Sequence, residues 1–263
     1  MDYLVGQLLG EIEAAGLTQS TLIVFHSDHG WSLGENGDWL KFSLTELGTR
    51  VPLIIKAPHF PHSVGRRSAA LVELVDIMPS VSELAGLPPP TVRHGDAPLD
   101  GISFAPLFAA NLSAATSGQP PPLQLKFKSH VWAQYPRCPA DGDFHDPQNA
   151  SDLWHRNMCI NTPSTGFQWM GYSLRTATWR YNAWFRWNGT SLTPILPPCS
   201  GGAGAAVVVP AAPLNGTGGF YNELYQYAPP PLTDFDSLEV HEVGAANPAV
   251  VAEMHATLLT LIL

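Results

Sequence analysis

The strongest constraint on the fold is a continuous apolar run that ends in an Asp-His-Gly turn. Residues 21–25 read Thr-Leu-Ile-Val-Phe, and Asp28, His29 and Gly30 follow shortly after them. A run without alternation is typical of a strand covered on both faces, as in a parallel sheet flanked by helices. Residues 2–16 place apolar side chains on one helical stripe ahead of it. This order predicts an α/β fold with ligands at the carboxyl end of the strand.

The following residues extend the same pattern. A second apolar run at 50–58 predicts another strand, and residues 68–90 are helical in pattern. Pro79 lies inside that segment, so either the helix is kinked there or a new helix begins. We therefore expect an α/β part over residues 1–110, built on a helix-flanked and mostly parallel sheet.

The second part of the chain has a different character. Aromatic and roughly alternating residues at 170–187 predict an antiparallel hairpin, and a final helix is expected at about 247–262. The segment near 199–219 is rich in Gly, Ala and Pro and is expected to be an insertion. Residues 111–263 are thus predicted to form a smaller antiparallel α+β subdomain that ends in a helix.

Charge and hydropathy exclude some partners. The net charge is −9 with only 13 Lys and Arg, whereas a nucleic-acid partner needs a basic face. A hard cation such as calcium suits an acidic chain better. No stretch reaches the ~20 apolar residues of a membrane span, and the first residues do not resemble a signal peptide. Four sequons favour a secretory history, and they begin at Asn111, Asn149, Asn188 and Asn215.

The cysteines give a limited constraint. Cys138, Cys159 and Cys199 allow at most one internal disulfide, and the sequence leaves the pairing open. Their spacings do not resemble a zinc site.

The residues of the Asp-His-Gly turn allow two interpretations. Asp28 and His29 offer a carboxylate and an imidazole to a divalent cation, and Lys41 offers a positive charge to a tetrahedral oxyanion. Equally, the turn can be an Asx turn at a strand end, with Lys41 a solvated surface residue. Glu46 is a candidate partner for Arg50 at i,i+4. The residues alone leave both interpretations open.

The chain reads "SDHG", then "GENGDWLK", then "ELGTRVPL", all within residues 27–53. This ordered set of motifs resembles the sulfatase family of the alkaline-phosphatase-like superfamily. Residues 71–90 and 99–108 also resemble the family's next helix and loop. The similarity is greatest to the iduronate-2-sulfatase branch, through residues 27–43, "QYPR" at 134–137 and the segment 170–187. The resemblance is continuous to about residue 110 and patchy beyond it.

The resemblance implies roles for four residues. Asp28 and His29 would bind Ca²⁺, Lys41 would contact the sulfate as a catalytic and substrate-binding residue, and Trp31 would lie near the substrate pocket. The family's substrates imply a sulfated carbohydrate or another sulfate ester, and a lysosomal or extracellular location for a full-length protein.

The departures from the family matter as much. Its nucleophile is a formylglycine made from Cys in "C-x-P-S-R", and none of the three cysteines has that context. Its paired Asp metal ligands are also missing, so the calcium site is expected to be only partly present. Asn36 stands where His is usual, and His26 where Thr is usual. We expect this chain to be the C-terminal part of a sulfatase that keeps a remnant of the family's sheet. The chain alone is expected to be inactive.

Two alternatives remain at this stage. One is a phosphoryl-transfer member of the same superfamily, which "GENGDWLK" followed by "RVP" disfavours. The other is a non-catalytic protein that binds sulfated glycans, in which Trp179, Trp184 and Trp187 could stack on sugars. Such tryptophans are more often core residues of a hairpin.

Overall fold

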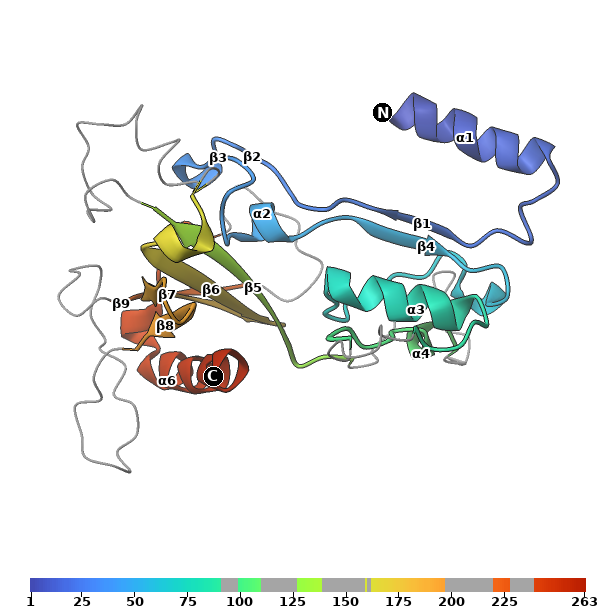
Figure 1. The fold of residues 1–263 in the computed structure, drawn as a ribbon. Coiled ribbons are helices and arrows are strands. Elements are labelled where there is room, and N and C mark those ends of the chain that lie inside the picture. Colours follow the sequence, from blue (N-terminus) through green and yellow to red (C-terminus); the bar gives the residue numbers. More distant parts are fainter. Residues whose placement is uncertain (91–98, 110–126, 139–158, 160–161, 197–219, 228–238) are drawn as a thin grey trace. The chain divides into compact units, whose positions relative to one another are not determined.

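The chain folds into two compact units. The structure is a computed structural model, and it describes residues 1–90, 99–109, 127–138, 159, 162–196, 220–227 and 239–263 (Figure 1). The first unit comprises Met1–Asp28 and Val51–Ser129, and the second comprises His29–Arg50 and His130–Leu263. The segment that carries most of the motif residues therefore belongs with the C-terminal part of the chain. The sequence boundary near residue 110 stays a prediction.

The first unit is built on a two-stranded antiparallel sheet. Strand β1 (Ile23–His26) pairs with β4 (Leu53–Lys56), with Ile23 opposite Lys56. Among the described residues each of these strands has no other ladder partner. The mostly parallel sheet predicted for residues 1–110 is therefore not confirmed.

Burial in this sheet also differs from the prediction. Phe25 is 42% exposed and Ile54 is 63% exposed, so the apolar run is not covered on both faces. The reason lies in the preceding helix α1 (Asp2–Ala14), which forms as predicted but buries none of its residues. Its apolar stripe consequently does not cover the sheet.

A buried carboxylate organises the remaining elements of the first unit. A short 3-10 helix (Leu74–Asp76) leads into α3 (Ile77–Leu84), so Pro79 lies in the first helical turn, where its missing N–H is harmless. Asp76 is fully buried, accepts the backbone N–H of Ile102 at 2.8 Å and pairs with Lys128 at 2.8 Å. The start of α3 is thereby tied to Ile102 and Lys128. A further short helix, α4, spans Pro106–Ala109. A 3-10 helix also spans Pro61–Ser63.

The second unit contains a five-stranded antiparallel sheet. Strands β5 (His130–Arg137), β6 (Trp169–Thr176) and β7 (Trp179–Asn188) are neighbours in that order. Strands β8 (Thr193–Ile195) and β9 (Phe220–Gln226) share the other edge of β7. The predicted hairpin at 170–187 is thus confirmed as β6 and β7, which turn at residues 177–178.

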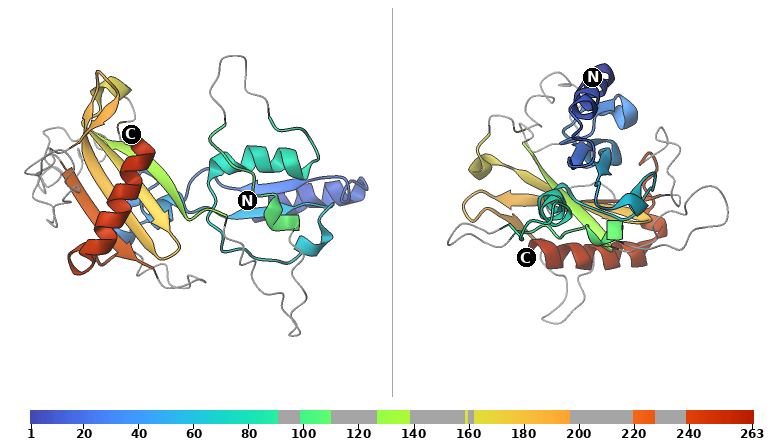
Figure 2. Two further views of the ribbon diagram at one scale, coloured as in Figure 1. Left: turned by 90° about the horizontal axis from the view of Figure 1, so that it is seen from below. Right: turned by 90° about the vertical axis from the view of Figure 1, so that its right-hand side faces the viewer.

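One face of this sheet packs against helix α6 (Pro248–Ile262) (Figure 2). Side chains alternate between the faces along a strand, so every second residue of β7 enters the core. The buried residues of this core are Met170, Tyr172, Leu174, Tyr181, Ala183, Phe185, Leu224, Val251, Met254 and Leu258. Burial of each large apolar side chain contributes about 1.5–3 kcal/mol. Two further 3-10 helices span Ser164–Gly166 and Gly244–Ala246.

The structure pairs two of the three cysteines. Cys138 and Cys159 form a disulfide across 21 positions of the chain, while Cys199 lies outside the described residues. The insertion near 199–219 and the sequons at Asn111, Asn149 and Asn215 also lie outside them. Within the described part of the chain, no helix has the length and apolar character needed to cross a membrane.

Candidate functional site

The motif-bearing residues form a compact segment, here called the motif loop (residues 29–50). It contains a small hairpin of β2 (Ser32–Leu33) and β3 (Trp39–Leu40), joined through a 3-10 helix at Glu35–Gly37, and ends in the short helix α2 (Glu46–Thr49). Gly34 and Gly37 have φ angles of 121° and 75°, which favour glycine. The glycines of the "GENGDWLK" motif therefore allow the tight turn that places Lys41.

Gly30 is required by a close backbone approach. Its N–H donates to the carbonyl of Gly48 at 2.9 Å, which ties the Asp-His-Gly turn to α2. A Cβ at position 30 would lie 1.8 Å from the carbonyl oxygen of Leu47. Only glycine lets the turn pack here, and this packing positions the residue before it, His29.

The motif loop brings His29 and Lys41 together. The Nζ atom of Lys41 lies 2.9 Å from Nε2 of His29, although twelve positions separate them. Nδ1 of the same ring lies 2.9 Å from the carbonyl oxygen of Gly30. This arrangement assigns the Nδ1–H donor to Gly30 and leaves Nε2 to accept from the ammonium group.

The two other predicted residues lie on either side of His29 in the sequence. The Trp31 ring centroid is 6.2 Å from that of His29, and its side chain is 49% exposed. Asp28 is exposed and is the last residue of the first segment of the first unit. The structure thus gathers His29, Trp31 and Lys41 within the second unit.

The side chains around the Asp-His-Gly turn offer few donors to a metal ion. Among the described residues there is no group of three or more His, Cys, Asp or Glu side chains that could hold a metal ion. Asp28 and His29 supply one carboxylate and one imidazole, whereas Ca²⁺ takes 6–8 oxygen ligands. Nε2 of His29 is also engaged with Lys41. The described residues do not by themselves fit a calcium ion.

A buried ion-pair network holds the motif loop on the sheet. Glu46, only 5% exposed, lies 2.5 Å from Nη2 of Arg180 and 3.2 Å from Nε of Arg175. Burial would raise the pKa of Glu46, but the charges of Arg180 and Arg175 overcome this and lower it. The predicted pair with Arg50 is confirmed at 3.7 Å. The two buried arginine partners were missed because they lie more than a hundred positions away.

Further contacts attach the loop to the same face of the sheet. Nη1 of Arg180 donates to the carbonyl of Leu44 at 3.1 Å, and its Nε pairs with Glu239 at 2.6 Å. Nη2 of Arg137 donates to the carbonyl of Phe42 at 2.6 Å. The face opposite α6, here called the polar face, therefore carries the loop.

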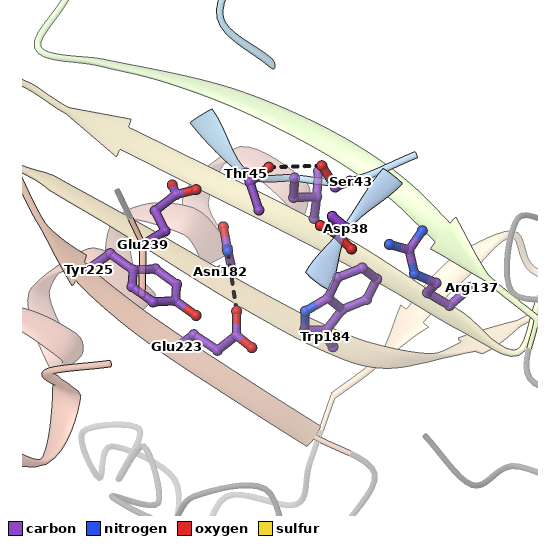
Figure 3. A pocket seen from close by; sticks show the side chains of 10 residues that line it. Asp38, Ser43, Thr45, Arg137, Asn182, Trp184, Glu223, Tyr225 and Glu239 are labelled. Carbon is purple, nitrogen blue, oxygen red and sulfur yellow. Dashed lines mark hydrogen bonds between the residues drawn. The ribbon is translucent and has the colours of Figure 1, made fainter. Parts of the chain in front are cut away.

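A cavity of about 210 Å³ lies between the loop and the polar face (Figure 3). Asp38 comes from the loop, Arg137 from β5, Asn182 and Trp184 from β7, and Glu223 from β9. Of the three tryptophans that sequence reasoning considered for sugar stacking, Trp184 lines this cavity. Trp179 and Trp187 instead pack against the hydrophobic core.

Comparison with known proteins connects these features to one family. The family model described as Sulfatase matches residues 1–87. Iduronate 2-sulfatase of Homo sapiens is 33% identical over 223 residues, which cover 72% of this chain and 36% of that protein. The Mus musculus protein of the same name is 32% identical over 223 residues, covering 70% and 36%. The chain thus spans about a third of the length of these relatives.

More distant relatives extend the picture. Arylsulfatase K of Xenopus laevis is 30% identical over 161 residues, which cover 56% of this chain and 28% of that protein. Among solved structures, the phosphonate monoester hydrolase SpPMH from Silicibacter pomeroyi aligns with a TM-score of 0.54 at 18% identity. That alignment covers 99% of this chain and 37% of the other, and it indicates a shared fold alone.

Proposed function

Because this chain belongs to the sulfatase family, we propose that its motif loop binds the sulfate group in a sulfuric ester hydrolase. Lys41 stabilises the negative charge on the sulfate oxygens, and Trp31 borders the substrate. Asp28 and His29 would contribute to a calcium site only if other residues complete it and Nε2 of His29 gives up its contact with Lys41. The observation that carries the proposal is the 2.9 Å contact of Lys41 with His29 beside a turn that only glycine permits.

The chemistry needs more than this loop supplies. Hydrolysis of a sulfate ester by a sulfatase requires a nucleophile together with groups that stabilise the developing charge. In the family a formylglycine is the nucleophile, and a bound Ca²⁺ would act as a Lewis acid on the sulfate. The three cysteines of this chain lie in "RCPADG", "MCINTP" and "PCSGG" rather than in "C-x-P-S-R". We therefore propose that the chain alone does not hydrolyse sulfate esters.

The proposed substrate is a sulfated glycan. The proposed location of the full-length protein is the secretory pathway, either lysosomal or extracellular. Support comes from the names of the relatives, which include iduronate 2-sulfatase and arylsulfatase K. The second candidate is a protein that binds sulfated glycans without cleaving them, and the position of Trp184 in the wall of a cavity favours it. Both candidates require Lys41 to bind sulfate.

Calorimetric titration of the chain with a sulfated disaccharide and with inorganic sulfate tests the binding step. Lys41→Gln is expected to weaken binding of both at least tenfold, because it removes the positive charge from the sulfate site. Arg67→Gln removes one charge at an exposed position of the first unit and is the matched control. Equal binding by wild type and Lys41→Gln would contradict the proposed role of Lys41.

Two measurements separate the enzyme from the binding protein. The purified chain is expected to release no 4-nitrophenol from 4-nitrophenyl sulfate. Release of 4-nitrophenol would refute the proposed inactivity. Sequencing of the transcript upstream of Met1 then distinguishes a hydrolase from a binding protein. An in-frame "C-x-P-S-R" would support the hydrolase, whereas a stop codon directly upstream would leave the binding protein as the better candidate.

A further inference from the structure

The cavity under the motif loop has the construction of a binding site. Asn182 of β7 and Glu223 of β9 lie directly opposite each other in the sheet register. Both project from the polar face, as do Trp184 and Tyr225. In Figure 3 these side chains surround a common space with Asp38 and Arg137. The walls therefore come from the rigid sheet, with the motif loop as the cover.

Two residues that line this cavity, Asn182 and Arg137, each carry a buried polar atom with no hydrogen-bond partner among the described residues. Asn182 is 3% exposed, and its Nδ2 donates to Glu223 at 3.4 Å. Its Oδ1 atom is buried and makes no hydrogen bond to any described residue, and the same holds for Nη1 of Arg137. A buried polar group left unpaired destabilises the folded state, and a ligand that pairs with it removes that cost. One of these atoms accepts and the other donates, so a hydroxyl-bearing ligand could satisfy both.

The cavity also has an aromatic wall. The ring of Trp184 lies over Gly171, where a Cβ would come within 2.4 Å of the ring. The missing side chain seats the indole against the sheet, and the Arg137 guanidinium lies 5.3 Å from its centroid. Tyr225 adds a second ring with a hydroxyl group. Rings that present both apolar and polar atoms suit a ligand that has both kinds of surface.

Size and charge narrow the choice of ligand. The cavity of about 210 Å³ is smaller than the ~300–1,000 Å³ of sites for drug-sized ligands, so it suits a single ring. Burial raises the pKa of both Asp38 and Glu223, and Arg137 only partly opposes this at Asp38. Carboxyl groups that already disfavour their own charge would also disfavour a sulfate or carboxylate ligand. An uncharged ligand fits best.

We propose that this cavity binds an uncharged sugar ring, the neighbour of the sulfated sugar in the glycan substrate. The identification of that neighbour rests on the proposed function, whereas the sugar-binding property rests on the cavity alone. Hydroxyl groups of the ring pair with Oδ1 of Asn182 and Nη1 of Arg137. The C–H face of the ring packs against Trp184. The cavity would then select glycans by a sugar that carries no sulfate.

Saturation-transfer NMR and calorimetry on the full chain test this with neutral methyl pyranosides of glucose, galactose and N-acetylglucosamine. At least one is expected to bind to the wild type. Asn182→Leu is expected to weaken that binding at least tenfold, because it removes the unpaired acceptor. Tyr225→Phe, which removes only a hydroxyl group, provides a second variant that preserves the ring. It is expected to weaken binding about threefold or more.

The matched control is Tyr221→Phe, the same change on the same strand and face. The ring of Tyr221 packs at 5.1 Å from that of Trp169 and does not line the cavity. Binding within twofold of wild type is expected. Equal losses in Tyr221→Phe and Tyr225→Phe would overturn the proposal, as would a cavity that holds only water and binds none of the pyranosides.

Titration with inorganic sulfate keeps the two proposals distinguishable. If sulfate binds and no pyranoside does, the sugar site is refuted while the proposed function stands. If a pyranoside binds and sulfate does not, the sugar site stands while the proposed sulfate-binding function fails.

Discussion

At the scale of single residues, two titratable groups of the second unit, Glu46 and His255, are buried and each has a partner. Glu46 receives two guanidinium groups from the sheet, and His255 lies under the sheet with Nδ1 2.8 Å from the hydroxyl of Tyr181. The ion pairs of Glu46 and the burial of His255 each lead to a testable change in the free energy of unfolding. The seven tryptophans among the described residues all belong to the second unit, so tryptophan fluorescence follows the unfolding of that unit.

Glu46→Gln is expected to destabilise the second unit strongly. The change leaves Arg175 and Arg180 buried without their shared carboxylate, and loss of one partner of a buried ion pair costs roughly 3–5 kcal/mol. Urea unfolding followed by tryptophan fluorescence measures the effect. Arg50→Ala removes the partly exposed partner of the same carboxylate and should cost below about 1 kcal/mol. Similar losses in both variants would contradict this account.

His255 should make the second unit less stable at acidic pH. Burial lowers the pKa of His255 to about 4, below its ordinary value of 6.5, so the unfolded chain binds the proton more readily. The stabilising contribution is complete above pH 6.5 and is lost as the pH falls towards 4. Between pH 7 and 5 the loss is about 1–2 kcal/mol.

The matching measurement compares the free energy of unfolding at the two pH values in wild type and His255→Gln. Gln cannot titrate, so the variant should lose less stability on acidification than wild type does. An identical pH dependence in the two proteins would show that His255 is not responsible.

At the scale of elements, the motif loop depends on one close contact between the turn and α2. Gly30→Ala is expected to destabilise the second unit by about 1–3 kcal/mol, because the new methyl group would overlap the carbonyl of Leu47. It should also weaken sulfate binding by displacing His29. Thermal unfolding and sulfate titration measure the two effects.

Gly6→Ala in α1 is the control for this change. Nothing lies within 4 Å of a Cβ at position 6, and Ala favours a helix over Gly by up to about 1 kcal/mol. This variant should therefore be neutral or slightly stabilising. If Gly30→Ala leaves the free energy of unfolding unchanged, the motif loop can shift to accommodate the new methyl group, and the prediction is wrong.

At the scale of the whole molecule, the first unit exposes an apolar helix. Tyr3 is 74% exposed, and Leu4 and Leu8 are each 62% exposed. Contiguous exposed apolar surface promotes association. The isolated chain is therefore expected to self-associate and to bind the dye ANS.

The double variant Leu4→Glu, Leu8→Glu should reduce both effects without changing the tryptophan-detected unfolding of the second unit. Size-exclusion chromatography over a concentration series measures the association. The prediction is wrong if wild type elutes as a monomer at every concentration and binds no dye.

The sequence predicted most elements but not their environment. Helices α1 and α6 and the β6–β7 hairpin follow from patterns that a few consecutive residues carry. Strand β1 also forms where predicted, but its partner strand runs antiparallel and Phe25 is exposed. An apolar run indicates that a strand can be covered, while the covering element depends on distant parts of the fold. The parallel sheet was therefore an inference from the neighbours that such a strand usually has.

For the candidate site, the sequence alone predicted which residues would carry the chemistry, and their roles stay a prediction. Spacing placed Asp28, His29 and Lys41 around glycines because tight turns are local and need specific residue types. The tertiary fold sets the packing of the motif loop on the polar face and the pairing of Arg180 with Glu46, 134 positions away. Strand register and the alternation of side chains between the two faces of the sheet create the cavity beneath the motif loop. Such contacts join distant residues, so no local pattern encodes them.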